Sequence, residues 1–360
     1  MSPELTKHGR LLSLDVYRGL TMLLMCSSGL GLGVLENTPG WSWLARQVDH
    51  VAWKGCVLWD LIQPSFMFIV GVAMPLAFAI RSARGQSRAQ QFKHVVKRSL
   101  SLLIIGVALI CVSRGKYVID LTTVLQQIAI GYFFAFFVLG RGFRVQTITV
   151  FLILAVHWAL FQFWPGVGPD GPWAKNANFA SWLDYLWLNR YDPGGYTSFN
   201  AFSSTATIIF GVMAGELLRK EITEKRKVVY LALAGVCFLI LGTLLHPLIP
   251  VVKRIWTASW AIYSTGWALL LLAFFYWVIE VAGRRKWCFI FMVVGMNSIF
   301  IYVFNWLMRG SLNEWIWAFT RPVLDPLGAP GTIIQSVLLL AALWYSVYWL
   351  YKREIFLKVG

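Results

Sequence analysis

Residues 57–80 read VLWDLIQPSFMFIVGVAMPLAFAI, an apolar run with a single carboxylate, Asp60, near its start. A helix rises about 1.5 Å per residue, so about 20 such residues cross a bilayer core about 30 Å thick. The rest of the chain has the same character: of its 360 residues, 58% are hydrophobic and 13% are charged. This composition excludes an ordinary soluble domain and indicates an integral membrane protein.

Ten windows of the chain have the composition of a membrane-spanning helix. They cover residues 12–34, 57–80, 99–113, 122–140, 145–164, 199–218, 228–246, 255–282, 288–308 and 332–351. The third window is short, so we expect its helix to extend into the flanking polar residues. No internal repeat is visible, and the sequence therefore predicts one all-α domain, residues 1–360, folded as a polytopic bundle of about ten transmembrane helices.

The net charge of +16 is distributed unevenly among the loops. One set of alternate loops carries roughly twice as many lysines and arginines as the other set, and such an excess marks the cytoplasmic side. It places both termini in the cytoplasm, as an even number of spans requires, and it argues against a nucleic-acid partner. The long loops 35–56, 165–198 and 309–331 then lie on the outer side. We expect a multi-pass protein of a bacterial inner (plasma) membrane.

Polar side chains inside the predicted spans are costly and are therefore functional candidates. Asp15 and Arg18 lie three residues apart on one helix face, so they either form an anchoring ion pair or leave Arg18 facing a pocket for an anionic ligand. Pro64 is expected to kink the second span. Further polar groups are the side chains of Gln126, Gln127, Asn297, Ser298 and Asn305. Such groups either bond neighbouring helices together or line a cavity.

His50 is the histidine that the sequence singles out for chemistry. It precedes the turn Trp53-Lys54-Gly55 on the predicted outer side, and Asp60 follows ten residues downstream. An imidazole with a carboxylate nearby can accept a proton near neutral pH, so His50 is a candidate general base. Either Asp60 or Asp49 can orient its ring, and we favour Asp60, which would be desolvated at the entrance of the span. The five cysteines are scattered without the spacing of metal ligands, and we expect no metal site.

Six segments, taken in order, carry a resemblance to a known family. They are RLLSLDVYRGLTMLLM, HVAWKGCVLWDLIQPSFMFIVGVAMPLAF, TTVLQQIAIGYFFA, YDPGGYTSFNAFSSTATIIFGVMAGELLR, KRIWTASWAIYSTG and GMNSIFIYV. Together they resemble the transmembrane acetyltransferases typified by heparan-alpha-glucosaminide N-acetyltransferase. The resemblance implies that acetyl-CoA from the cytoplasm donates an acetyl group to the amino group of a terminal glucosamine across the membrane. It also assigns the catalytic role to His50 and suggests a homodimer.

Acetyl-CoA is too large and too charged to cross a bilayer, so we expect a narrow channel that leads its thioester to His50. Basic residues at the inner end would bind its phosphates, and polar groups in the channel would bind its pantetheine arm. The candidates are Arg10, Arg18, Arg98, Gln126, Gln127, Asn297, Ser298, Lys352 and Arg353. The residues that we assign to the acceptor sugar are Asp49, Asp192, Tyr196 and Lys253. His50 acts either as the general base of a direct transfer, which we favour, or as a carrier of the acetyl group.

Three positions depart from the family pattern. Ser28 and Gly29 stand where family members carry an asparagine, the DPEG element reads DPGG with Gly194 in place of the carboxylate, and Gln127 replaces an arginine in VLQR. Because of these changes, the resemblance does not identify the acceptor sugar. Two other interpretations compete with the first: a polysaccharide O-acetyltransferase, and a sugar or solute transporter in which His50 relays protons.

Overall fold

The computed structural model describes residues 11–119 and 121–357, which form helices joined by loops, with no strand in these two ranges. The α-helices are α1 (Leu12–Ser27), α2 (Ser42–Gln47), α3 (Ile62–Ala83), α4 (Arg88–Arg114), α5 (Val124–Val138), α6 (Phe143–Gln162), α7 (Phe179–Leu188), α8 (Asn200–Leu218), α9 (Glu224–Leu245), α10 (Ala258–Tyr276), α11 (Phe289–Met296), α12 (Ser298–Leu324) and α13 (Ala329–Lys352). The shorter helical segments are η2 (Ser28–Leu35), η3 (Leu58–Leu61), η4 (Trp277–Val281), η5 (Lys286–Cys288) and η6 (Asp325–Leu327). The all-α prediction is confirmed. Arg10 lies outside the described residues.

Eight helical segments are long and apolar enough to cross a membrane, and they match eight of the ten predicted spans. The short third window does extend into polar residues, since α4 runs from Arg88 to Arg114. The predicted fourth span is α5, whose 15 residues are fewer than a typical span contains. The predicted ninth span is bent by 69° between α11 and α12. The described residues therefore contain eight candidate spans, or nine if the bent pair counts as one.

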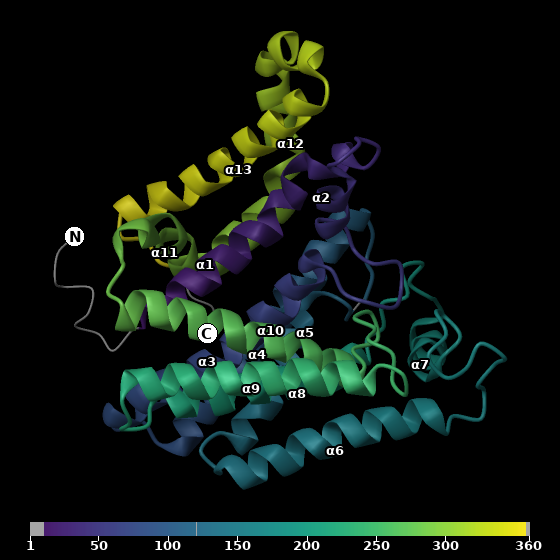
Figure 1. The fold of residues 1–360 in the computed structure, drawn as a ribbon, viewed down its shortest axis with the longest axis vertical. Coiled ribbons are helices and arrows are strands. Elements are labelled where there is room, and N and C mark those ends of the chain that lie inside the picture. Colours follow the sequence, from purple (N-terminus) through teal and green to yellow (C-terminus); the bar gives the residue numbers. More distant parts are fainter. Residues whose placement is uncertain (1–10, 120, 358–360) are drawn as a thin grey trace.

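The predicted outer loop at 309–331 is wrong. The helix α12 continues to Leu324, and α13 begins at Ala329, so only a short turn connects them. Residues 311–321 contain neither glycine nor proline, the residues that most disfavour a helix, and α12 includes Gly310 before them and Pro322 after them. Figure 1 shows α12 and α13 as a hairpin whose turn projects beyond the other helices. The other two predicted loops contain the short helices α2 and α7.

The predicted kink at Pro64 is also wrong. The segment before Ile62 forms the tighter turn η3, and α3 begins only at Ile62. Pro64 therefore lies in the first turn of α3, where a backbone N–H has no partner within the helix, so the proline removes no helical hydrogen bond. The proline inside this helix is Pro75.

The helices α3 and α8 pack closely through glycines. A Cβ atom at Gly71 would lie 2.0 Å from the carbonyl oxygen of Ile208, and one at Gly211 would lie 2.2 Å from that of Phe68. Small residues allow this close approach of backbones in membrane bundles. The helix α1 packs on α11, α9 packs on α10, and α5 contacts both α4 and α8. The loops at one end of this bundle carry the site described next.

Candidate active site

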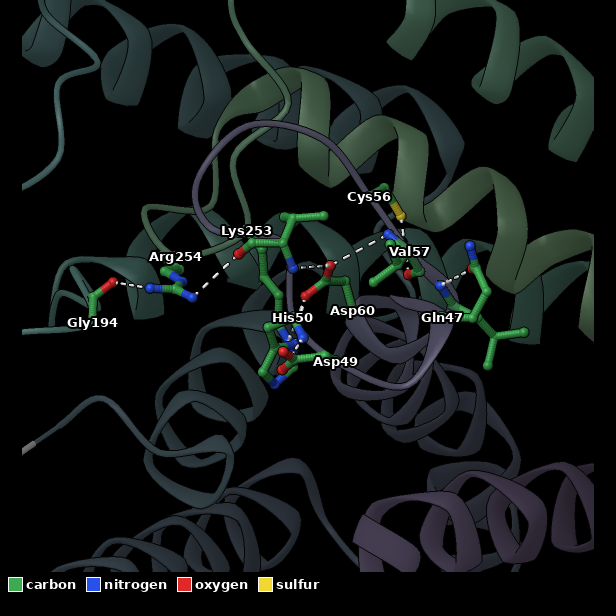
Figure 2. A network of polar contacts seen from close by, with 11 residues as sticks. Gln47, Asp49, His50, Cys56, Val57, Asp60, Gly194, Lys253 and Arg254 are labelled. Atoms are coloured by element: carbon green, nitrogen blue, oxygen red, sulfur yellow. Dashed lines mark hydrogen bonds and ion pairs between the residues drawn. The ribbon is translucent and has the colours of Figure 1, made fainter. Parts of the chain in front are cut away.

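His50 and Asp60 are in direct contact where the loop after α2 leads into η3. His50 Nδ1 lies 2.7 Å from Asp60 Oδ1 (Figure 2). The Asp60 side chain is buried, with 1% exposed, whereas 35% of the His50 side chain is exposed. The intervening residues fold back on the carboxylate, because the backbone N–H groups of Val51 and Val57 both donate to Asp60 Oδ2. Asp60 therefore organises the loop as well as the imidazole.

Lys253 is the third member of the His50–Asp60–Lys253 cluster and comes from the loop before α10. Its Nζ lies 3.3 Å from Asp60 Oδ1 and 3.2 Å from His50 Nδ1. Lys253 is almost fully buried, with 4% exposed. Burial lowers the pKa of Lys253 to about 8, although the neighbouring Asp60 carboxylate opposes this change. The buried ammonium thus depends on Asp60 for its compensating charge.

The cluster determines which nitrogen of His50 carries the proton. An ionised carboxylate only accepts hydrogen bonds, so its 2.7 Å contact with the imidazole requires a proton on Nδ1. Nε2 then holds the lone pair and can act as a base. Lys253 donates to Asp60 and balances its charge. The arrangement can therefore hold a neutral imidazole in one orientation with its basic nitrogen available.

Arg254 connects the loops around the cluster. It donates to the carbonyl oxygen of Gly194 (Figure 2) and to that of Val51, and its guanidinium lies 5.4 Å from the centre of the Tyr196 ring. Asp192 accepts a hydrogen bond from the backbone N–H of Tyr196, so the DPGG segment is a turn fixed at both ends. Burial raises the pKa of Tyr196, and its hydroxyl stays protonated at neutral pH.

A cavity of about 370 Å³, the outer cavity, lies beside the His50 ring. Aromatic rings and a few polar groups form its walls, which is the usual character of a small-molecule site. The lining residues are Met25, His50, Trp59, Ile62, Gln63, Thr122, Thr123, Val124, Tyr196, Lys253, Tyr302 and Trp306. The exposed part of the His50 side chain therefore faces a chamber with room for a substrate.

A second cavity of about 300 Å³, the inner cavity, adjoins the first. Met25, Val124 and Tyr302 line both cavities, so these side chains lie at the boundary between them. Arg18 and Arg98 line the inner cavity among largely apolar residues. The Nε atom of Arg98 is buried without a hydrogen-bond partner in residues 11–119 and 121–357. A half-buried guanidinium whose buried Nε atom has an unused donor is suited to an anionic ligand.

The sequence is similar to known proteins over most of its length. The family model described as heparan-alpha-glucosaminide N-acetyltransferase, catalytic, matches residues 10–249. The chain belongs to this family. Two curated relatives, the heparan-alpha-glucosaminide N-acetyltransferases of Mus musculus and Homo sapiens, are 24% and 25% identical to it over 417 and 420 residues. Each match covers 97% of this chain and 60% of the relative, so the chain spans about 60% of the length of these relatives.

The acetyltransferase family match confirms the resemblance seen in the sequence motifs. The matched residues 10–249 include His50, Asp60 and both arginines of the inner cavity, whereas Lys253 lies just beyond them. The family match therefore includes His50, Asp60 and part of the inner-cavity lining, whereas Ser298 and Tyr302 of that lining lie beyond it. The role of Lys253 follows from the contacts alone.

Three of the residues assigned to acetyl-CoA, namely Arg18, Arg98 and Ser298, line the inner cavity. Gln127 Oε1 accepts a hydrogen bond from the side chain of Gln63, which lines the outer cavity. The side chain of Gln126 is also buried, and its Oε1 accepts a hydrogen bond from the backbone N–H of Thr123. The two glutamines thus support the walls of the cavities rather than lining them.

The other three residues assigned to acetyl-CoA line neither cavity. The Asn297 side chain bonds the backbone of residues 355–357, donating to one carbonyl and accepting from one N–H. The Lys352 ammonium and the Arg353 guanidinium lie over aromatic rings of α13, and the latter is 3.9 Å from the ring centre of Trp349. Asn297 therefore anchors the segment after α13 at the bend between α11 and α12.

The residues assigned to the acceptor also separate into two groups. Tyr196 and Lys253 line the outer cavity. Asp192 holds the DPGG turn, and Asp49 is exposed and accepts a hydrogen bond from the backbone N–H of His50 at 2.7 Å. Asp49 and Asp192 therefore shape the loops that carry the cavity residues.

Sequence reasoning missed the aromatic walls of the outer cavity and the loop contacts of Arg254. Trp59 and Gln63 are four residues apart, as are Tyr302 and Trp306, so each pair can face one side of a helical segment. This spacing was a usable signal beside Asp60. The role of Arg254 had no local signal, because its partners come from distant loops.

Proposed function

We propose that this protein is a membrane acetyltransferase that passes an acetyl group from cytoplasmic acetyl-CoA to the amino group of a glucosamine-like sugar on the outer side. The observation that carries the proposal is the order of groups along the two cavities, with Arg18 and Arg98 in the inner one and His50 in the outer one. Family membership supports acetyl transfer, and the names of the relatives support an amino-sugar acceptor.

The inner cavity is the proposed site of the donor. Acetyl-CoA carries phosphate groups, for which arginine offers two parallel donors in a fixed geometry. Arg98 has a buried donor atom to offer, and Arg18 brings a second guanidinium to the lining of the same cavity. The apolar walls between these arginines and Tyr302 suit the uncharged arm of the donor. Its thioester would then approach the outer cavity past the side chains that both cavities share.

In the proposed reaction, His50 Nε2 takes a proton from the acceptor amine as the amine nitrogen attacks the thioester carbonyl carbon. The new C–N bond forms, the C–S bond breaks, and the proton held by His50 passes to the departing thiolate. Asp60 keeps the imidazole in the required tautomer, as a carboxylate does for other catalytic histidines. The other path, in which Nε2 attacks the thioester first, predicts release of coenzyme A in a burst before acceptor is added.

The proposal includes an orientation and an assembly. The excess of lysine and arginine on alternate loops supports a cytoplasmic location for the arginine end of the cavities and for both termini, in a bacterial inner membrane. Accessibility of a tag on each terminus in intact cells and in inverted vesicles tests the orientation. A homodimer is also proposed, and the mass of the detergent-solubilised protein tests it.

Purified protein in liposomes, supplied with labelled acetyl-CoA and glucosamine, tests the activity. We expect labelled N-acetylglucosamine, and we expect His50→Ala to lower the rate at least about 100-fold, which is the usual contribution of a general base. Lys54→Ala, an exposed change in the same loop, is the control and should keep the rate. Equal melting temperatures of the three proteins would exclude unfolding as the cause.

The same assay separates the competing functions. An amide product survives mild alkaline hydrolysis, whereas the ester product of an O-acetyltransferase does not. Movement of solute across the liposome membrane without release of coenzyme A would replace the proposed function by a transporter.

A further inference from the structure

A third cavity, of about 430 Å³, lies on the other side of the N-terminal turn of α3 from the outer cavity. Ile62 lines both of them and forms part of the wall between them. Most of the lining is apolar and comes from α1, the loop before η3 and α10, with Leu20, Leu24, Leu61 and Leu271 among its residues. We call it the apolar cavity. Neither the family nor the proposed reaction gives it a role.

The helix α1 separates this cavity from the proposed transfer route. Met22 and Met25 line the inner cavity, whereas Leu20 and Leu24 line the apolar cavity. The apolar cavity is therefore a distinct chamber. Val57, whose N–H donates to Asp60, lines it, but the cavity can be filled from α1 and α10 without replacing a residue that contacts His50.

The position of the cavity identifies its occupant. The cavity lies among α1, α3 and α10, all of which belong to candidate membrane spans, so lipid chains are the surrounding solvent. Its rim reaches that solvent, since Leu58 is 52% exposed and Trp267 is 38% exposed. Protein interiors are close-packed, and apolar cavities stay dry and bind apolar molecules. The membrane supplies hydrocarbon chains, and such a chain matches the apolar lining of this cavity.

The lining of the cavity also contains polar side chains, among them Gln47 and Cys56 (labelled in Figure 2) and, on α1 and α3, Thr21 and Ser65. Gln47 Oε1 accepts a hydrogen bond from the backbone N–H of Leu58 at 3.1 Å. These residues belong to the same outer loops that carry His50. A lipid whose chain fills the cavity would therefore place its headgroup at the level of the outer cavity, where amphipathic side chains such as Trp267 are favoured.

We propose that the apolar cavity binds one hydrocarbon chain of a membrane lipid, with the headgroup beside Gln47. The chain can come from a structural phospholipid or from the lipid anchor of an amino-sugar acceptor, because the cavity recognises the chain. A bound structural phospholipid would stabilise the loops that carry the active site. The lipid anchor would bring the acceptor to His50 from the side of the bilayer.

Native mass spectrometry of the detergent-purified protein tests the site, because detergent removes the bulk lipid and leaves bound lipid. Leu24→Trp fills the cavity with a larger ring, and Leu271→Phe fills it from the opposite helix. Leu233→Trp is the matched control, since Leu233 is exposed on α9 and lines none of the three cavities. We expect one lipid on the wild type and on the control, and at least a tenfold lower occupancy on both filled variants. Melting temperatures show which variants are folded.

Adding single compounds to delipidated protein distinguishes the two sources. Binding of phosphatidylglycerol alone assigns the site to a phospholipid, and binding of dodecyl glucosaminide alone assigns it to the anchor of an acceptor. The proposal is wrong if neither compound binds the wild type, or if folded filled variants bind as well as the wild type does. It is also wrong if the filled variants change the fraction of dimer and not the bound lipid, since the cavity is then an interface between copies. Because the readout is bound mass, its result is independent of acetyl transfer.

Discussion

The outer and inner cavities differ in how their charged groups are satisfied. In the outer cavity, His50, Asp60 and Lys253 contact one another within 3.3 Å, and the carboxylate also accepts two backbone N–H bonds. In the inner cavity, Arg98 has a buried Nε atom without a hydrogen-bond partner in the described chain. The charged groups beside the outer cavity therefore have their partners without a ligand, whereas Arg98 in the inner cavity has a hydrogen-bond donor that a ligand can use.

This difference matches the two tasks of a transferase. A catalytic base must be held in one orientation before the substrate arrives, because a small displacement is costly to the rate. An anchor for a charged substrate must instead retain donors that the ligand can use. We therefore expect changes at the outer cavity to affect kcat and stability, and changes at the inner cavity to affect the KM for acetyl-CoA.

Asp60→Ala should have the largest effect on the outer cavity. It removes the group that fixes the His50 tautomer, so we expect the rate to fall at least about 100-fold. It also leaves the buried ammonium of Lys253 without a carboxylate, which costs about 3–5 kcal/mol in the free energy of unfolding. Denaturant unfolding and the acetyltransferase assay measure the two losses.

A double variant separates the two losses of Asp60→Ala. Asp60→Leu combined with Lys253→Met removes both charges, so we expect it to recover the part of the stability lost through the unpaired ammonium and none of the activity. The backbone N–H groups of Val51 and Val57 still lose their acceptor, so the recovery is partial. Asp170→Ala, an exposed carboxylate in another outer loop, is the matched control and should change neither. If the double variant is as active as the wild type, the cluster is a structural ion pair.

Arg98→Ala should have the next largest effect, at the inner cavity. A hydrogen bond to a charged group contributes about 1.5–3 kcal/mol, so its loss should raise the KM for acetyl-CoA about tenfold or more. We expect kcat and the melting temperature to change little, and Arg98→Lys to be intermediate because lysine lacks the planar fork. Arg84→Ala is an exposed control. A fall in kcat at unchanged KM would contradict the assignment of catalysis to the outer cavity and of donor binding to the inner cavity.

The pH dependence should show a smaller effect, through Lys253. Its pKa in the folded protein, about 8, lies below its ordinary value of 10.5, so the folded state releases this proton first. As pH rises through 8, the ammonium that balances Asp60 is lost and we expect activity to fall. Between about pH 8 and 10.5, the unfolded chain keeps the proton of Lys253 and the folded protein has released it. The free energy of unfolding contributed by Lys253 should therefore rise with pH in this range.

Lys253→Arg tests the pH dependence, because arginine keeps its charge throughout this range. We expect the fall in activity above pH 8 to disappear in this variant, at the cost of a few-fold loss in rate from the larger side chain. Rate measurements from pH 6 to 10 compare the two proteins. An unchanged profile would assign the alkaline fall to another group.

The sequence predicted the spans well because the bilayer imposes a length and a composition on every crossing helix. The contact of His50 with Asp60 was also predictable, since ten residues with a turn at Gly55 can return to their start. The helix α12 was not, because its residues beyond 308 are too polar for a span, and the sequence does not show that a helix can continue past the bilayer as a projecting hairpin.

The remaining features depend on contacts between distant residues. Lys253 and Asp60 are 193 residues apart in the chain, so no local pattern joins them. The polar residues of the spans could equally bond other segments, and the structure shows both outcomes: Ser298 lines the inner cavity, while its neighbour Asn297 anchors residues 355–357. The sequence identified the polar positions, and only the packing of the helices decided which of them face a cavity.

The smallest effect should come from the basic residues at the end of α13. Lys352 and Arg353 lie over aromatic rings away from both cavities, so replacing both by glutamine removes exposed charge and no described ligand contact. We expect the KM for acetyl-CoA to change by less than about twofold, as for other exposed charges. Measuring it at low and high salt would detect long-range attraction of the donor. If this variant raises the KM as much as Arg98→Ala does, the phosphates of the donor bind at the membrane surface, and the inner cavity holds only its uncharged arm.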